Sequence, residues 1–255
     1  MKLSAVLFDV GVIISESEEI HRCSFNEAFR EFGLSWYWDE AIYKELVLVG
    51  GGKERIKYYI KRAFPELLKQ KNLKNYIQSI HKIKSQVYED LLNDFDIQPR
   101  PGVLRLLKEL KKNGLRLSLV SDTTEENLKN LFKKGLNILP QEWFEVIAHG
   151  GCNLPKKPSS EIYFWALEQL KLPAESCIAI EDYQRGVESA VGAGLKVIVT
   201  PSMYTIVEEL KGPILVVSDL GELNCPLKII EGNGFDEKFI NLKGLKALHA
   251  ASKNK

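Results

Sequence analysis

The chain has 255 residues, of which 45% are hydrophobic and 27% are charged, and its formal net charge is +1. This length can enclose a large hydrophobic core, and the composition is that of a soluble globular protein. The balanced charge argues against a nucleic-acid partner, and no apolar run approaches the roughly 18 residues that cross a bilayer. We therefore expect no nucleic-acid partner and no membrane partner.

Cysteine usage bears on the compartment. The four cysteines are scattered and form no CxxC pair. Scattered cysteines without such a pair favour a reducing compartment. The first residues also lack an apolar segment followed by a cleavage site, which a secretory signal would need. We expect a monomer in the cytoplasm or the plastid stroma.

The first predicted elements are one strand and a long helical segment. Residues 4–8 form an apolar run that ends at Asp9, which indicates a buried parallel strand. From about residue 20 apolar residues recur every four positions, and up to about residue 94 only helical patterns occur. Three glycines at 50–52 interrupt them. This pattern predicts an inserted all-α domain.

Strands and helices alternate after residue 99. Apolar runs predict strands over 115–120, 144–148, 177–180, 197–200 and 214–217. Amphipathic patterns predict helices over 103–112, 124–134, 161–170 and 187–193, and a last one from 243 onward. Such alternation is typical of a parallel sheet with helices on both faces. We predict an α/β fold: a doubly wound parallel sheet with a Rossmann-like core, built from 1–15 and 96–255, with a helical cap inserted over 16–95.

Polar residues come directly after several predicted strands. Asp9, Ser121 and Asp182 each follow the last apolar residue of a strand. Lys157 follows a further apolar segment after a loop. Ligands in open α/β sheets bind beyond the carboxyl ends of the strands, so we expect these side chains to converge on one crevice. Taken singly, each is more often a helix cap, a turn residue or part of a solvated loop.

Five stretches of the chain together resemble one known family. In chain order they are LFDVGV at 7–12, HRCSFN at 21–26, GGGKER at 50–55, Lys157-Pro158 with Tyr163, and Glu181-Asp182 with Gly186. They resemble the haloacid dehalogenase-like hydrolases, in particular the CbbY-type sugar-bisphosphate phosphatases and the related β-phosphoglucomutases. The second and third stretches favour the CbbY type. The likeness covers nearly the whole chain and implies a magnesium-dependent phosphatase of a small phosphorylated sugar, such as the ketose bisphosphate xylulose-1,5-bisphosphate.

The resemblance also implies a role for individual residues. Asp9 would attack phosphorus and form an aspartyl phosphate, while Ser121 and Lys157 would hold the phosphoryl oxygens. The resemblance assigns Mg²⁺ to the carboxylates of Asp9, Asp182 and Glu181 and to the carbonyl of Gly11. The implied substrate-binding residues are His21, Arg22, Gly51, Gly52, Lys53, Arg55, Asp122 and Thr123. Without the resemblance, Arg22 and Arg55 read as ordinary solvated helix residues.

One residue that the family pattern includes is missing. A second aspartate normally stands two residues after the nucleophile, where this chain has Gly11. Compared with the CbbY pattern, an aspartate between Val10 and Gly11 is deleted; compared with the mutase pattern, Gly11 replaces the aspartate without a gap. That aspartate acts as general acid and base, a contribution of about 10²–10⁴-fold in rate. Glycine retains only its carbonyl, and Glu16 or Glu18 would have to replace the carboxylate. A second departure is Tyr183, where the family has a small serine.

Three alternatives therefore stay open beside the phosphatase. The first is a catalytically impaired homologue that binds phosphosugars without turnover. The second is a phosphomutase, which would depend even more on the missing acid. The third is a dehalogenase, whose first motif lacks the second aspartate. The acidic pair Glu181-Asp182 argues against the dehalogenase, because that chemistry requires no metal ion.

Overall fold

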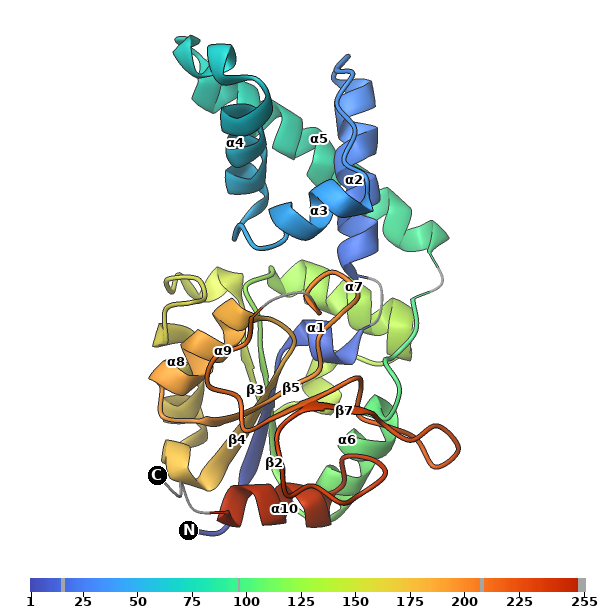
Figure 1. Cartoon of the computed structure of the whole chain (residues 1–255), viewed down its shortest axis with the longest axis vertical. Helices are drawn as coiled ribbons and strands as arrows, with labels where there is room; N and C mark the ends of the chain where they lie inside the picture. The colour runs from blue at the N-terminus through green and yellow to red at the C-terminus, as the bar shows by residue number, and fades with distance from the viewer. Residues whose placement is uncertain (15–16, 96, 207–208, 252–255) are drawn as a thin grey trace. The chain divides into compact units, whose positions relative to one another are not determined.

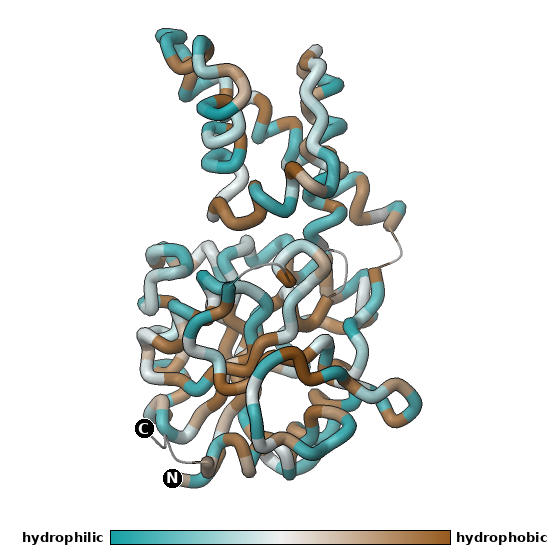
Figure 2. The backbone as a smooth tube through the Cα atoms, viewed as in Figure 1, coloured by the Kyte–Doolittle hydropathy of each residue, from teal (hydrophilic) through white to brown (hydrophobic). Residues whose placement is uncertain are grey.

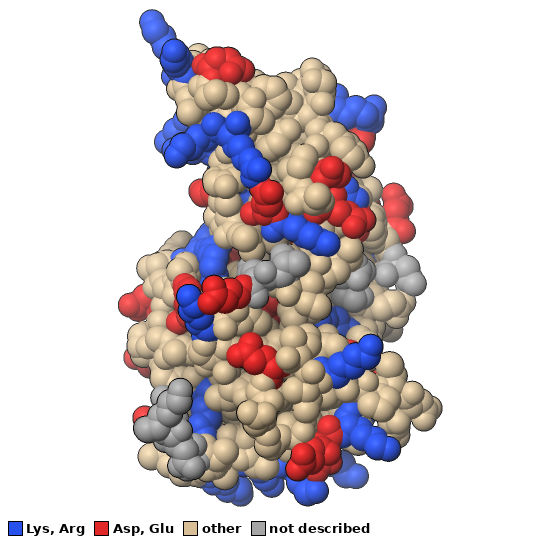
Figure 3. Space-filling model, viewed as in Figure 1, with Lys and Arg blue, Asp and Glu red and all other residues tan. Residues whose placement is uncertain are grey.

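The structure, a computed structural model, describes residues 1–14, 17–95, 97–206 and 209–251. The chain separates into two compact units, which we call the core unit (Met1–Ser15 with Gln98–Lys255) and the helical unit (Glu16–Ile97) (Figure 1). Basic and acidic side chains both occur on the face of each unit drawn in Figure 3, in line with the balanced net charge. Among the described residues, no helix combines the length and the apolar character that a membrane crossing needs.

A seven-stranded sheet forms the centre of the core unit. Its order is β3-β2-β1-β4-β5-β6-β7, and every neighbouring pair is parallel except β6 with β7. The strands are β1 (Ala5–Phe8), β2 (Arg116–Val120), β3 (Val146–Ala148), β4 (Cys177–Glu181), β5 (Lys196–Val199), β6 (Leu215–Val217) and β7 (Ile229–Glu231). The doubly wound parallel sheet is confirmed. The antiparallel edge strand β7 was not predicted, because its run of two isoleucines is too short and too exposed to show a period.

Helices follow the strands of the core unit. They are α1 (Val10–Ile13), α6 (Val103–Lys112), α7 (Glu125–Leu136), α8 (Glu161–Leu170), α9 (Gln184–Gly192) and α10 (Leu242–Ala250). Alternate residues of the central strands, such as Leu7 and Ala179, lie in one buried cluster with residues of α8 and α9. Helix α6 packs against β2, helix α10 packs against β4, and the two helices contact each other. Figure 2 shows the apolar strands inside the core unit.

Several predicted boundaries differ from the observed ones. The strand expected over 144–148 begins at Val146, and the helix expected over 187–193 begins earlier, at Gln184. Helix α1 was not predicted, because a four-residue helix is too short to show a helical period. The last helix ends at Ala250, and its expected continuation over 252–255 lies outside the described residues.

The helical unit contains only helices in its described part, as predicted. They are α2 (Ser17–Glu31), α3 (Glu40–Leu46), α4 (Gly52–Ala63), the 3-10 helix η1 (Pro65–Lys69) and α5 (Leu73–Asp94). Helices α2 and α5 pack along each other. Aromatic side chains fill the interior: the rings of Phe25 and Phe29 lie 4.5 and 4.8 Å from the ring of Trp38. These ring contacts give the unit a hydrophobic core of its own.

Candidate active site

Asp9 stands at the carboxyl end of β1, which lies between β2 and β4 in the sheet. The preceding residue, Phe8, is in register with Leu119 of β2 and with Ile180 of β4. This parallel register brings the ends of the three strands to one edge of the sheet, as the sequence pattern predicts. The Asp9 carboxylate caps helix α1, because its Oδ2 accepts a hydrogen bond from the Gly11 N–H at 2.6 Å.

Lys157 links Asp9, which follows β1, to Glu181, the last residue of the neighbouring strand β4. Its Nζ donates to Asp9 Oδ1 at 2.6 Å and to Glu181 Oε1 at 2.7 Å, and the side chain is fully buried. Burial by itself lowers the pKa of Lys157, but the carboxylates of Asp9 and Glu181 outweigh burial and raise that pKa well above its usual value. The ammonium is therefore a permanent cation held between two acids.

Three buried carboxylates gather around this lysine. Asp9, Glu181 and Asp182 each offer an oxygen, and these oxygens lie within 4.8 Å of one another. Glu181 Oε2 and Asp182 Oδ1 have no hydrogen-bond partner among the described residues. Carboxylate oxygens are the donors that Mg²⁺ prefers, and a buried carboxylate oxygen without a partner is costly unless a cation is bound there. This acidic cluster therefore fits a divalent cation.

Burial is the largest influence on the pKa of Glu181, the last residue of β4, and on that of Asp182, which follows the strand. It raises the pKa of Glu181 to about 7, although Lys157 acts in the opposite direction. It also raises the pKa of Asp182 well above its ordinary value, and the nearby charges of Asp9 and Glu181 raise it further. Arg100 and Lys157 lower the pKa of Asp182.

Two glycines allow the acidic cluster to pack closely. A β-carbon added to Gly11 would lie 2.7 Å from Asp182 Cγ, so the carboxylate of Asp182 occupies the space beside this residue. A β-carbon added to Gly186, in the first turn of α9, would lie 2.8 Å from Glu181 Oε1. The Gly11 carbonyl, a predicted metal ligand, accepts a hydrogen bond from Arg100 Nη1 at 3.1 Å. A carbonyl has two lone pairs, so this contact leaves one of them for a cation.

The loop after β2 borders the same lysine. Ser121 is buried, and its Oγ accepts a hydrogen bond from the Thr123 N–H at 3.2 Å. Asp122 Oδ1 accepts from the Lys157 backbone N–H at 3.2 Å, and burial is the main cause that raises the pKa of Asp122. Asp122 therefore lies beside Lys157, and the role of Ser121 and Asp122 in binding the substrate stays a prediction.

Two tyrosines complete the surroundings of Lys157. The Tyr163 hydroxyl donates to Glu181 Oε1, and Lys157 Nζ lies 5.4 Å from the centre of the Tyr163 ring. The ring of Tyr183 is 5.8 Å from the same atom, within the range of a cation–π contact. Tyr183 thus places an aromatic face near the ammonium where the family pattern has a serine.

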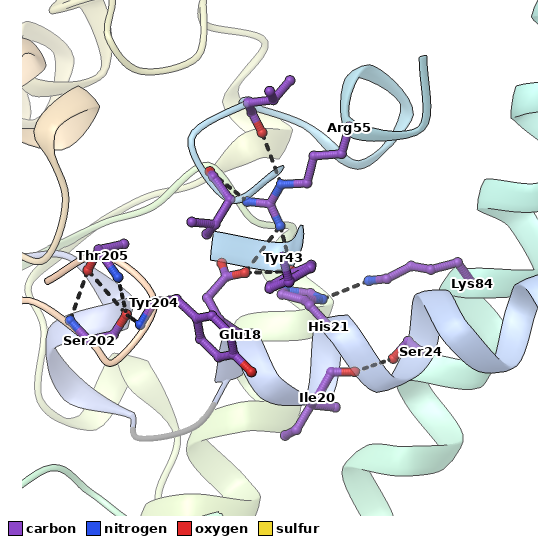
Figure 4. Close-up of polar contacts among 12 residues, drawn as sticks. Glu18, Ile20, His21, Ser24, Tyr43, Arg55, Lys84, Ser202, Tyr204 and Thr205 are labelled. Carbon is purple, nitrogen blue, oxygen red and sulfur yellow. Dashed lines mark hydrogen bonds and ion pairs between the residues drawn. The ribbon is translucent and has the colours of Figure 1, made fainter. Parts of the chain in front are cut away.

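In the helical unit, Arg55 belongs to an internal polar network (Figure 4). Its Nη1 donates to Glu18 Oε2 at 3.1 Å and to the Tyr43 hydroxyl at 2.7 Å, and its Nε donates to the Val49 carbonyl at 2.9 Å. Glu18 also accepts from the Tyr43 hydroxyl at 2.7 Å. Both carboxylate and guanidinium are therefore engaged within this unit. Glu16, the other acid considered as a replacement for the missing aspartate, lies outside the described residues.

His21 is part of a second buried contact, with Lys84 of α5. Lys84 Nζ lies 2.7 Å from His21 Nδ1, and the His21 ring stacks on Tyr88 at 4.2 Å between centroids (Figure 4). Burial, followed by the charge of Arg55, lowers the pKa of Lys84 to about 7, although Glu18 raises it. Burial, followed by Lys84, also lowers the pKa of His21 well below its usual value.

The remaining predicted substrate-binding residues of the helical unit differ in exposure. Arg22 Nε donates to Glu19 Oε2 at 2.9 Å and its Nη1 donates to the Trp38 carbonyl at 3.0 Å. Lys53 is exposed near the start of α4, next to Gly52, and Gly51 is the N-cap of that helix. Their role in binding substrate stays a prediction.

Two residues near the acidic cluster were not identified from the sequence. Thr205 Oγ1 donates to the Asp182 carbonyl at 2.7 Å and so fixes the backbone of this acid. Arg100 binds the Gly11 carbonyl. Arg100 lies between two prolines in a segment that reads as a turn, so no period or strand end marks it. Thr205 follows β5 by several residues of loop and is equally unmarked.

Comparisons with known proteins agree with this geometry. A family model described as haloacid dehalogenase-like hydrolase matches residues 6–200. Protein CbbY of Cereibacter sphaeroides is 37% identical over 223 residues, which cover 87% of this chain and 94% of that protein. The plasmid-borne protein CbbY of Cupriavidus necator is 34% identical over 247 residues, 97% of each chain.

Solved structures of CbbY proteins also match. A mutant of CbbY from Rhodobacter sphaeroides, crystallised in complex with xylulose-1,5-bisphosphate, is similar with a TM-score of 0.75 and 36% identity, covering 87% of this chain and 98% of that one. A β-phosphoglucomutase from Clostridium difficile matches with a TM-score of 0.68 at 20% identity, covering 88% of this chain and 93% of that one. The latter likeness shows the fold alone.

Proposed function

This chain belongs to the haloacid dehalogenase-like hydrolase family and is a phosphatase of its CbbY group, and we propose that it removes a phosphoryl group from a small phosphorylated sugar with Mg²⁺ as cofactor. The observation that carries the proposal is the Lys157 ammonium between Asp9 and Glu181, beside the unpartnered oxygens of Glu181 and Asp182. A ketose bisphosphate such as xylulose-1,5-bisphosphate is the substrate that we favour, since a similar CbbY protein was crystallised with it.

The proposed reaction uses Asp9 as nucleophile. An Asp9 oxygen bonds to phosphorus while the bond from phosphorus to the sugar oxygen breaks. Water then bonds to the phosphorus of the aspartyl phosphate while the bond from phosphorus to the Asp9 oxygen breaks, which releases inorganic phosphate and frees the carboxylate. Lys157, together with Ser121, would hold the phosphoryl oxygens, and its charge balances that of Asp9. Asp9, Asp182 and Glu181 would hold Mg²⁺, which neutralises negative charge on the transferring group.

The departing sugar oxygen requires a proton, and residue 11 has no side chain to donate it. Loss of general acid catalysis lowers the rate by about 10²–10⁴-fold. The second candidate function follows from this gap: a protein that binds a phosphosugar and a divalent cation with little turnover. The observation that favours this alternative is the close packing of Asp182 against Gly11, because a side chain at that position would have to displace the Asp182 carboxylate.

Phosphate release from a panel of sugar mono- and bisphosphates, with and without Mg²⁺, tests both functions. Three chains are compared: the chain itself, a chain with Asp inserted after Val10, and Asp9→Asn as the control without a nucleophile. We expect the insertion to raise the rate by about 10²-fold or more. An equal rate without the insertion would identify another group as the acid.

Three further outcomes separate the alternatives. Tight sugar-phosphate binding, with no phosphate release from either of the two chains that retain Asp9, would establish the binding protein. Halide release that does not depend on Mg²⁺ would instead establish a dehalogenase, and phosphate moved to another position of the sugar would identify a mutase.

The four cysteines are free thiols, and we infer a reducing compartment, the cytoplasm or the plastid stroma.

A further inference from the structure

Arg100 joins three segments that follow strands of the core sheet. Its Nη1 donates to the carbonyls of Thr200, at 2.7 Å, and Gly11, at 3.1 Å. Its Nη2 donates to the carbonyls of Pro201, at 2.9 Å, and Ser218, at 3.3 Å. One guanidinium thus holds the segments after β1, β5 and β6. The planar fork of arginine suits several acceptors at once, which the single ammonium of lysine cannot reproduce.

The backbone of Arg100 is fixed against the same short helix. The Arg100 N–H donates to the Ile13 carbonyl at 3.0 Å, and Pro99 forms a β-bridge with Ile14. Arg100 therefore contacts α1 near its start, through Gly11, and at its end, through Ile13. A four-residue helix has few hydrogen bonds of its own, so these external contacts define its position.

The Gly11 residue connects Arg100 to the proposed nucleophile. Its N–H donates to Asp9 Oδ2 at 2.6 Å, and its carbonyl accepts from Arg100. Asp182 packs against the α-carbon of the same residue. Movement of Gly11 would therefore change the orientation of the Asp9 carboxylate and the space that Asp182 occupies. The positive charge of Arg100 also acts on Asp182, whose pKa it lowers.

We propose that Arg100 is a positioning residue of the active site, which orients the Gly11 carbonyl and the Asp9 carboxylate for a divalent cation. The inference rests on the proposed function, because it assumes that the acidic cluster binds such a cation. Groups that orient metal ligands from outside typically change metal affinity by about 10–100-fold when they are lost.

The test measures the affinity of the full chain for Mn²⁺, a spectroscopic substitute for Mg²⁺, by electron paramagnetic resonance. Arg100→Lys retains the charge and loses the fork. Arg105→Lys is the matched control, because Arg105 also holds three carbonyls after β6 and before α10, those of Leu220, Gly221 and Ile240. We expect Arg100→Lys to weaken Mn²⁺ binding by about 10-fold or more, and Arg105→Lys to leave it within about twofold of the unaltered chain.

A purely structural role for Arg100 would give a different pattern. Both variants would then lose thermal stability, and both would bind Mn²⁺ as the unaltered chain does, which overturns the inference. If Arg100→Lys does not fold, Arg100→Gln, which keeps two N–H donors, is titrated in its place with the same criterion. Failure of the unaltered chain to bind Mn²⁺ would overturn the proposed metal site itself and this inference with it. Binding that Arg100→Lys leaves unchanged overturns the role of Arg100 alone.

Discussion

Lys157 in the core unit and Lys84 in the helical unit are both buried lysines, but their partners differ. Lys157 donates to two carboxylates, and its pKa is raised well above the usual value although burial alone would lower it. Lys84 contacts the neutral imidazole of His21 and the faces of two aromatic rings, and burial lowers its pKa to about 7. The same side chain is thus a fixed cation in one unit and a titrating group in the other, because only Lys157 has carboxylate partners at hydrogen-bond distance.

This difference matches the chemistry of the two units. A phosphoryl group carries negative charge throughout the proposed reaction, so the residue that holds it benefits from a charge that does not depend on pH. Two carboxylates beside Lys157 secure that charge. Asp182 adds a third buried acid, so the cluster holds three acidic side chains beside the single ammonium of Lys157. A divalent cation would offset this excess, which is why the core cluster, and not the helical one, fits a metal.

The largest effect is expected for Lys157→Met. This variant leaves Asp9 and Glu181 buried without their cation, and breaking a buried ion pair in this way typically costs about 3–5 kcal/mol of unfolding free energy. Denaturation by guanidinium at pH 7, followed by tryptophan fluorescence, measures the change. Lys156→Met alters the exposed neighbour and is the matched control. Equal stabilities for the two variants would show that Lys157 does not neutralise the acidic cluster.

A second, smaller effect is expected when another acid is added to the core cluster. Gly11→Asp restores the side chain of the family pattern, but its β-carbon would meet the Asp182 carboxylate and its charge would join three other acids. We expect a loss of about 1–3 kcal/mol of unfolding free energy.

Gly11→Ala separates the two causes of that loss. Alanine adds the same β-carbon without the carboxylate group, so the difference between the two variants reports the added effect of that group, its size and its charge. If Gly11→Asp were as active as the chain with Asp inserted after Val10, then Asp182 must be able to move aside, and the close packing at Gly11 would not explain the missing acid.

The sequence locates most residues of the core site because they stand at strand ends. Asp9, Ser121 and Asp182 each follow an apolar run, and the parallel register of β1, β2 and β4 brings such positions together. The fold class follows from the same alternation of short apolar runs and amphipathic helices. Arg100 could not be found in this way, because its role depends on carbonyls at 11, 200, 201 and 218 that only the folded chain brings within reach of one guanidinium.

The polar contacts of the helical unit were harder to predict from the sequence, for a physical reason. Helical periodicity predicts which face is buried but not which polar side chains are buried with it. Arg55 and His21 were predicted to bind substrate, and the structure shows their contacts with Glu18, Tyr43 and Lys84. Lys84 has no motif that distinguishes it from the exposed Lys82 two residues earlier.

A change in the pH dependence of stability, which tests the second half of the comparison, is expected for Lys84→Met. The pKa of Lys84 is about 7 in the folded chain and near the ordinary 10.5 when the chain unfolds. Between these values the unfolded chain binds more protons than the folded one, so the free energy of unfolding rises with pH by up to about 1.4 kcal/mol per pH unit. Methionine does not titrate, and the variant therefore lacks this contribution.

The measurement is the difference in unfolding free energy between the unaltered chain and Lys84→Met from pH 7 to pH 10, with Lys82→Met as the exposed control. The free energy of unfolding of the unaltered chain should increase relative to that of the variant as the pH rises. The loss of the contact with His21 adds only a constant offset over this range. Other groups titrate in both chains and cancel in the difference. A difference that does not change with pH would mean that Lys84 remains charged when buried, and the contrast with Lys157 would then rest on geometry and not on protonation.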